Sequence, residues 1–240
     1  MFKFLAIVSI IVGGIIFYFI FSIVRRQKEV MKWQQARIKA EIETLENERR
    51  RIASDLHDEL GPMLSAVKLQ INHLEPTDET EIVVLNKSSG QIDEIIQRFR
   101  DISYDLLPNT LVRKGLVSAV EEFIDRLNGA HKVRIGFSSP DLNLPSDREI
   151  NIYRIIQEIV HNTIKHARAT SLSITIKKGA NLLIIKTVDD GIGFDYEEKL
   201  QVANGLGLLN LHSRAEVLGG QLKVFSQVGK GATFLIEIPY

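Results

Sequence analysis

The order of apolar and polar residues divides the chain into regions of different character. Residues 4–24 carry no charged side chain and are followed at once by Arg25 and Arg26. A helix over this range extends about 30 Å, roughly the thickness of a bilayer core. The alternative is a cleaved signal peptide, whose apolar region usually spans only about 7–15 residues. We predict a single-pass membrane anchor over residues 1–26, with the positive flank and the rest of the chain in the cytoplasm.

The next region has the pattern of two long helices. Residues 27–56 are highly charged and contain neither glycine nor proline, and a second helical pattern runs from about 80 to 106. The apolar positions of the first helix recur in steps of three and four, which is typical of a helix that pairs with another copy: Ile38, Ile42, Leu45, Ile52 and Leu56. The turn-rich segment 75–78 predicts an antiparallel hairpin. One hairpin cannot cover both apolar faces, so a homodimer with a four-helix bundle is expected.

From residue 111 onward, helical and strand patterns alternate. Helices are predicted over about 115–128, 147–168 and 207–218, and strands over 132–138, 171–178, 182–188, 221–227 and 232–238. Several helices against one mostly antiparallel sheet form an α/β two-layer sandwich. The predicted organisation is therefore a membrane-anchored, multidomain chain: anchor 1–26, coiled-coil linker 27–48, dimerisation domain 49–110 and sandwich domain 111–240.

Charge and cysteine content narrow the functional classes. The chain has 30 Lys and Arg against 30 Asp and Glu, so no basic excess favours direct binding of nucleic acid. It contains no cysteine, which excludes disulfide frameworks, thiolate metal sites and cysteine nucleophiles.

One histidine stands out in the stretch RIASDLHDELGPML, residues 51–64. His57 lies one residue past Leu56 and is therefore rotated about 100° from the apolar stripe, where it is reachable. A neutral imidazole is a competent nucleophile near pH 7, and Asp58 can orient the ring or accept its proton. Gly61 and Pro62 follow and are expected to bend the helix just beyond the histidine. The alternative is a surface histidine without a role.

A second polar group is predicted in the sandwich domain. Glu158, Asn162, Lys165 and His166 follow one another at helical spacing, opposite an apolar face. An amide oxygen and a carboxylate one turn apart suit Mg²⁺, and the lysine and histidine suit phosphate oxygens. A solvated outer helix face is the alternative.

Glycines surround the ends of the predicted strands and helices of this domain. The strand LLIIKTV leads into Asp189, Gly191 and Gly193, where a carboxylate and two glycines permit close approach of a ligand to the backbone. Gly205 and Gly207 then open a helix whose N-terminus can hold phosphate. The combination and order of these motifs distinguish them from ordinary turns.

Together these motifs resemble a known family. The ExxxN helix, DxGxG, GLGL and GxGATF resemble the Bergerat-type ATP-binding fold shared by histidine kinases, type II topoisomerases and related chaperones. The stretch ERRRIASDLHDELGPML resembles the phosphoacceptor box of the histidine kinase subfamily typified by nitrate sensors and the membrane-fluidity sensor desaturase kinase. The resemblance covers about residues 45–240.

The resemblance implies ATP and Mg²⁺ as cofactors and gives each motif residue a role. His57 would attack the γ-phosphorus, assisted by Asp58. The remaining implied roles belong to the ATP site: Asn162 and Glu158 for Mg²⁺, Lys165 and His166 for the phosphates, Asp189 for the adenine amino group with Gly191 and Gly193 permitting the fit, Gly205 and Gly207 as hinges of a lid, and Thr233 supporting the adenine site through water.

The implied function is a two-component sensor histidine kinase that passes phosphate to an aspartate in the receiver domain of a response regulator, one with a helix-turn-helix output domain. Pro62 departs from the pattern of the subfamily, whose members often carry a glutamine at this position. That glutamine is linked to dephosphorylation of the partner, and a proline cannot orient the attacking water that this reaction needs. One alternative is a catalytically silent, membrane-tethered scaffold that binds ATP. Another is an ATPase or chaperone of the same fold, which leaves His57 unexplained.

Overall fold

The computed structural model describes residues 2–129, 131–196 and 206–240, and it divides the chain into two compact units, residues 1–42 and 43–240. The first unit is the leading part of one helix, α1 (Phe2–Asp55). Within the described part of the chain, no helix is long and apolar enough to cross a membrane. The side chains at positions 2–12 and 16 lie outside that part, so the anchor expected over residues 4–24 stays a prediction.

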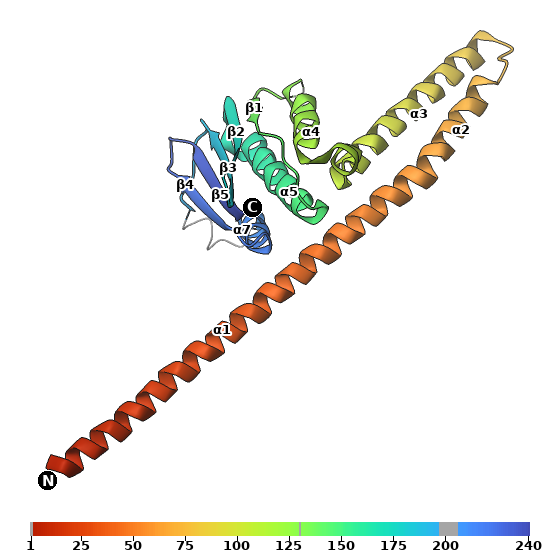
Figure 1. Ribbon diagram of the computed structural model, residues 1–240. Helices are drawn as coiled ribbons and strands as arrows, with labels where there is room; N and C mark the ends of the chain where they lie inside the picture. The colour runs from red at the N-terminus through yellow and green to blue at the C-terminus, as the bar shows by residue number, and fades with distance from the viewer. Residues whose placement is uncertain (1, 130, 197–205) are drawn as a thin grey trace. The chain divides into compact units, whose positions relative to one another are not determined.

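The second unit begins with the predicted helical hairpin (Figure 1). Helix α1 passes into a π-helical turn, η1 (Leu56–Leu60), then α2 (Gly61–Asn72), and α3 (Glu79–Leu106) packs back against α2. The Asp78 side chain caps α3 by accepting a hydrogen bond from the Glu81 backbone N–H at 2.8 Å. Pro62 lies in the first turn of α2, where the missing N–H is tolerated. The proline is therefore accommodated by the π-helical turn before it.

The rest of the second unit is a sheet with helices on one face (Figure 1). The strands are β1 (Arg134–Ser138), β2 (Ser171–Lys178), β3 (Leu182–Asp189), β4 (Gln221–Ser226) and β5 (Ala232–Pro239), in the order β1-β2-β3-β5-β4. Only the β1–β2 pair is parallel among these strands. The predicted two-layer sandwich with a mostly antiparallel sheet is therefore confirmed.

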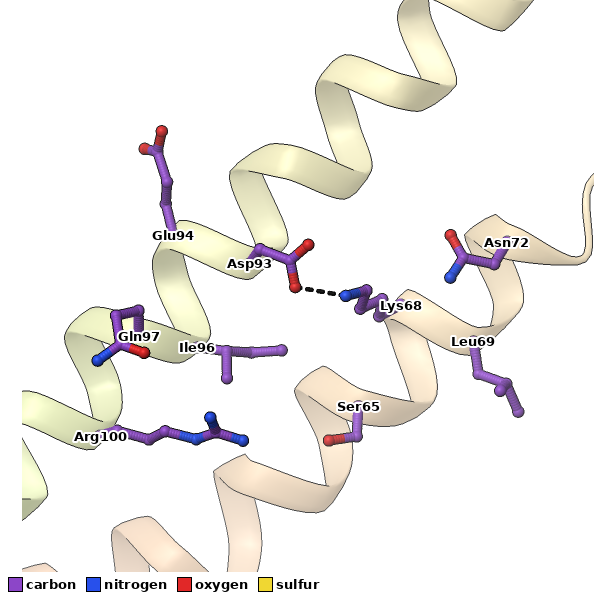
Figure 2. Close-up of a pocket in the computed structure, with 9 residues that line it drawn as sticks. All are labelled: Ser65, Lys68, Leu69, Asn72, Asp93, Glu94, Ile96, Gln97 and Arg100. Carbon is purple, nitrogen blue, oxygen red and sulfur yellow. Dashed lines mark hydrogen bonds and ion pairs between the residues drawn. The ribbon is translucent and has the colours of Figure 1, made fainter.

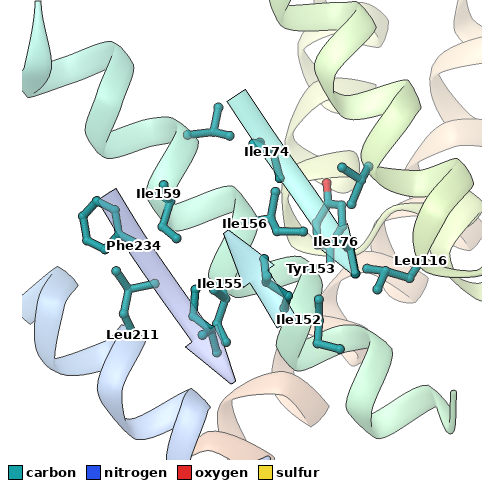
Figure 3. Close-up of a cluster of buried hydrophobic side chains, with 14 of the residues drawn as sticks. Leu116, Ile152, Tyr153, Ile155, Ile156, Ile159, Ile174, Ile176, Leu211 and Phe234 are labelled. Atoms are coloured by element: carbon teal, nitrogen blue, oxygen red, sulfur yellow. The ribbon is translucent and has the colours of Figure 1, made fainter. Parts of the chain in front are cut away.

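The covering helices are α4 (Asn109–Asn128), α5 (Ser146–Asn162) and α7 (Leu206–Val217). α5 is central because it packs against both α4 and α7. Its isoleucines meet inward-facing residues of β2, α7 and β5, as Figure 3 shows. Ile152, Ile155, Ile156 and Ile159 are completely buried. Each such side chain contributes roughly 1.5–3 kcal/mol through burial, so α5 is fixed firmly beneath the sheet.

Helix α4 differs from its prediction. It begins at Asn109, not near residue 115, and is interrupted at Gly115, whose φ of 81° lies in the left-handed region that favours glycine. The break is stabilised by Glu149, whose Oε1 accepts a hydrogen bond from the backbone N–H of Leu116 at 3.1 Å. Helical propensity alone does not reveal this break, because its partner lies on another helix.

Candidate active site

The Glu158–Asn162 pair lies at the C-terminal end of α5. Both side chains are half-buried, and the Asn162 Nδ2 donates to Glu158 Oε1 at 3.1 Å. Because the amide nitrogen faces the carboxylate, the carbonyl oxygen of Asn162 is left as an acceptor that can bind a cation. The arrangement provides oxygen ligands of the type that Mg²⁺ prefers.

The α-helix does not continue to residue 168 as predicted. A π-helical turn, η2 (Thr163–Ala167), follows Asn162 and ends at Arg168, which adopts a left-handed conformation with φ of 50°. Lys165 and His166 lie in this turn and are exposed. The wider turn changes their angular position relative to Asn162, so the i+7 and i+8 spacing from Glu158 no longer sets their direction. Both remain available to an anionic ligand.

Asp189 lies at the end of β3 and is only 6% exposed. Its Oδ1 accepts hydrogen bonds from the backbone N–H of Gly191 at 2.9 Å and of Ala232 at 3.3 Å. Burial raises the pKa of this carboxyl, and the two backbone donors oppose that shift. A buried carboxylate held in one orientation by the backbone can accept a specific hydrogen bond from a ligand.

The glycines after Asp189 are required by close packing. A Cβ on Gly191 would lie 2.3 Å from the Ala167 carbonyl oxygen, and one on Gly193 would lie 2.1 Å from the Gln227 carbonyl oxygen. The Ile192 backbone N–H also donates to the Ala167 oxygen at 2.8 Å. This loop is therefore fixed against the end of η2, which brings the Asp189 region toward the Glu158–Asn162 region.

Gly207 joins the same region from the first turn of α7. A Cβ at this position would lie 2.5 Å from Glu158 Oε1 and 3.4 Å from Asn162 Nδ2. The absence of a side chain thus lets the start of α7 touch both polar residues of α5. The backbone N–H groups at a helix N-terminus favour anions, so the predicted phosphate-binding role suits this placement. Gly205 lies outside the described residues.

Thr233 is not brought to this cluster. In the β3–β5 register, Thr233 pairs with Val188, whereas Ala232 pairs with Asp189. Since successive side chains alternate between the two faces of a sheet, Thr233 lies on the face opposite Asp189. The burial pattern agrees, because Ala232 and Phe234 are buried on the helix-covered face and Thr233 is not. The predicted water-mediated role of Thr233 is therefore not supported by its position.

Asp190 is a positioning residue that the sequence analysis missed. Its carboxylate accepts hydrogen bonds from the backbone N–H groups of Thr170 (2.8 Å) and Ser171 (2.9 Å) and from both hydroxyls. The side-chain bond from Thr170 is the largest cause that holds the pKa of Asp190 well below its usual range. Asp190 therefore ties the end of β3 to the segment leaving η2. The only sequence signal was a second aspartate beside Asp189.

The phosphoacceptor candidate lies in the π-helical turn η1, although the side chain of His57 is outside the described part of the structure. Asp58 beside it is exposed and accepts a hydrogen bond from Ser54 Oγ at 3.0 Å. Ser54 and Asp58 border a cavity of about 520 Å³ whose other walls include Val112 of α4 and Glu149 of α5. Asp58 is thus held in a defined orientation next to an open space.

A second hollow of about 810 Å³ follows the hairpin between α2 and α3. Figure 2 shows Lys68 of α2 reaching across to Asp93 of α3, where Nζ and Oδ1 are 2.5 Å apart. Ile96 points toward α2, whereas Leu69 points away and is 62% exposed. The hairpin is therefore joined partly by polar contacts and leaves apolar side chains uncovered.

Two segments of the chain match known protein families. Residues 48–111 match the family described as "Histidine kinase", and residues 147–240 match that described as "Histidine kinase-, DNA gyrase B-, and HSP90-like ATPase". The oxygen sensor histidine kinase NreB of Staphylococcus carnosus (strain TM300) is 26% identical over 217 residues, which are 89% of this chain and 62% of NreB. The chain thus spans less than two thirds of that relative's length.

Among solved structures, the histidine kinase domain of the blue-light activated histidine kinase from Erythrobacter litoralis EL346 is similar to this chain, with a TM-score of 0.50 and 15% identity. The likeness covers 75% of this chain and 94% of that domain. At this identity the likeness shows the fold alone, a helical region followed by an α/β domain.

Proposed function

We propose that the chain is a two-component sensor histidine kinase, because residues 48–111 match a histidine kinase family and residues 147–240 match a family of histidine kinase-like ATPases. In this proposal it transfers the γ-phosphoryl group of ATP to His57 and then to an aspartate of a response regulator. The observation that carries the proposal is the convergence of Glu158, Asn162 and Gly207 beside the Asp189 loop.

The side chains of this cluster fit ATP and Mg²⁺. The Asn162 carbonyl oxygen and the Glu158 carboxylate would hold the ion, which neutralises charge on the phosphates when bound. No group of three or more His, Cys, Asp or Glu side chains suited to a metal occurs among the residues described. A site with few protein ligands is typical of Mg²⁺ that completes its shell with phosphate oxygens and water. Asp189 would accept a hydrogen bond from the adenine amino group.

The reaction at His57 depends mainly on the positioning of the imidazole relative to the γ-phosphorus. A neutral ring nitrogen forms the new N–P bond while the bond between the γ-phosphorus and its bridging oxygen breaks, and ADP leaves. Asp58 stabilises the positive charge that develops on the ring or accepts its proton. The hydrogen bond from Ser54 holds the carboxylate of Asp58 for this task.

The hairpin supports a homodimer as part of the proposal. Several large apolar side chains of α2 and α3 are 44–62% exposed in the single chain: Met63, Val67, Leu69, Ile95 and Ile102. Burial of such a stripe against a second hairpin is the usual solution in a four-helix bundle. The phosphorylated histidine would then serve a receiver domain, in a regulator whose output domain is expected to be of the helix-turn-helix type.

The uncharged segment 4–24 supports a membrane location for the proposed kinase. Its length matches a bilayer core, and the Arg25–Arg26 flank favours the cytoplasmic side for the region that follows. The catalytic region would then work in the cytoplasm, where ATP and a response regulator are available.

The test is autophosphorylation of the full chain in lipid vesicles with γ-labelled ATP and Mg²⁺. We expect acid-labile, base-stable label on the parent and on His73→Gln, whose exposed histidine lies at the end of α2, but none on His57→Gln. ATP turnover without label would instead favour an ATPase, and ATP binding with neither turnover nor label would favour a silent scaffold.

A further inference from the structure

A buried carboxylate on α1 is bound by two arginines from different helices of the ATPase domain. Glu46 is 5% exposed, and its Oε1 accepts a hydrogen bond from Arg214 Nη2 of α7 at 2.6 Å. Its Oε2 accepts one from Arg154 Nε of α5 at 3.1 Å. The two arginines are 8% and 4% exposed. All three charged side chains are therefore withdrawn from water and depend on one another.

The remaining guanidinium donors of Arg154 are also paired. Arg154 Nη1 donates to the Asp105 carbonyl oxygen at 2.9 Å and to Gln157 Oε1 at 2.8 Å, and Nη2 donates to the Leu106 carbonyl oxygen at the end of α3. Burial lowers the pKa of Arg154, and the negative charge of Glu46 opposes that shift. Such complete pairing distinguishes this network from the exposed ion pairs of α1, which contribute little.

The same two helices carry the nucleotide residues. Arg154 precedes Glu158 by one turn of α5, and Arg214 follows Gly207 by about two turns of α7. One carboxylate of the linker helix thus holds both helices that form the Glu158–Asn162–Gly207 cluster. Any movement of α1 that withdraws Glu46 acts directly on the position of the ATPase domain.

Helix geometry relates this contact to the phosphoacceptor. Positions 46 and 57 are eleven residues apart, which corresponds to a rise of about 16 Å and a rotation within about 20° of three full turns. Because η1 continues directly from α1, both positions lie on nearly the same face of the helix that these two elements form. The ATPase domain is attached to that face about three turns before His57.

We propose that Glu46, Arg154 and Arg214 form a latch that restrains the ATPase domain on α1 and must open before the domain can deliver the γ-phosphoryl group to His57. This inference rests on the proposed kinase function and assigns its regulation. While Glu46 holds α5 and α7, the Glu158–Asn162–Gly207 cluster is held at the level of residue 46, about three turns before His57, although the start of α5 lines the cavity beside Asp58. Displacement or rotation of the upstream helix would open the latch and release the domain.

The test compares the full chain in lipid vesicles with Glu46→Gln and Arg214→Gln. Removal of one partner of a buried ion pair should shift the balance between latched and released states by on the order of 100-fold, because the arginines regain water only after release. The matched control is Glu48→Gln, since Glu48 lies on the same helix but its side chain is 50% exposed and pairs only locally with Arg51.

Two measurements are made on each variant. Hydrogen–deuterium exchange follows the latched segments of α1, α5 and α7, and the initial rate of His57 labelling follows the reaction, while ATP affinity verifies that the domain is folded. We expect faster exchange around residue 46 and a higher labelling rate in both latch variants, but not in Glu48→Gln. A double variant that combines Glu46→Gln and Arg214→Gln should raise the labelling rate by less than the product of the two single increases, since both substitutions open the same contact.

The inference would be overturned if Glu46→Gln exchanged and labelled like the parent, or if exchange rose while labelling stayed constant or fell. The second result would mean that the contact supports the reaction. Absence of label from the parent and every variant would refute the proposed kinase function itself, and with it the restraint on phosphorylation. A labelled parent with unaltered variants would refute the latch alone.

Discussion

The replacement Asp189→Asn should change which nucleotide base the domain prefers. Asp189 Oδ1 is held by the backbone N–H groups of Gly191 and Ala232. In the variant, the amide oxygen must take over these two bonds because only it is an acceptor. The amide nitrogen then faces the base, where it meets the donor amino group of adenine.

The magnitude follows from the burial of Asp189. A hydrogen bond to a charged group contributes about 1.5–3 kcal/mol, and at 6% exposure little water is available to replace it. The affinity for ATP should therefore fall by about 10- to 100-fold. GTP presents a carbonyl acceptor where ATP presents the amino group, so its binding should weaken less or improve.

The assay is equilibrium titration of the full chain with ATP and GTP, with Asp125→Asn as the control because Asp125 is exposed on α4. The pH dependence supplies a second readout. Burial raises the pKa of Asp189, and its ionised form accepts a stronger hydrogen bond from the adenine amino group than the protonated form does. The affinity of the parent for ATP should thus be highest above the raised pKa and fall as the pH drops through it. The affinity of Asp189→Asn for ATP should lack this pH dependence.

A variant that bound ATP within about twofold of the parent and kept its ratio of ATP to GTP affinity would refute this assignment of the adenine site. Loss of binding of both nucleotides together with a lower melting temperature would point to a structural role for Asp189. That result would also contradict a direct contact between Asp189 and adenine.

Three further predictions concern other residues. Gly207→Ala would place a Cβ 2.5 Å from Glu158 Oε1, so the Mg²⁺ concentration needed for half-maximal labelling should rise about tenfold, whereas Gly136→Ala, with open space around it, should match the parent. Asp190→Asn should lower the melting temperature at neutral pH. The pKa of Asp190 is lower in the folded chain than in the unfolded chain, where it is near 4, so the ionised carboxylate stabilises the folded state above that value. This stabilisation is lost as the pH falls through the folded pKa. The melting temperature of the variant should lack this acid dependence. Ile156→Ala, at a fully buried position, should cost about 2–5 kcal/mol in urea unfolding.

The architecture was largely predictable because its signals are local. The alternation of apolar residues in β2 and β3, and the three- and four-residue periodicity of α3 and α5, depend only on which face of each element meets the core. Predicted and observed strands therefore agree to within about two residues. The π-helical turns were not predicted, because they depend on hydrogen bonding that composition does not encode.

The residue types of the candidate site could be read from the chain: a histidine beside an aspartate, an acid–amide pair one turn apart, and a carboxylate that ends an apolar strand and precedes two glycines. Which of these groups meet depends on the folded structure. Strand register placed Ala232 opposite Asp189 and turned Thr233 to the other face. The union of Glu46 with Arg154 and Arg214 joins positions up to 168 residues apart. No local pattern specifies such a contact, because the stabilisation of a buried charge depends on partners that only the folded chain brings together.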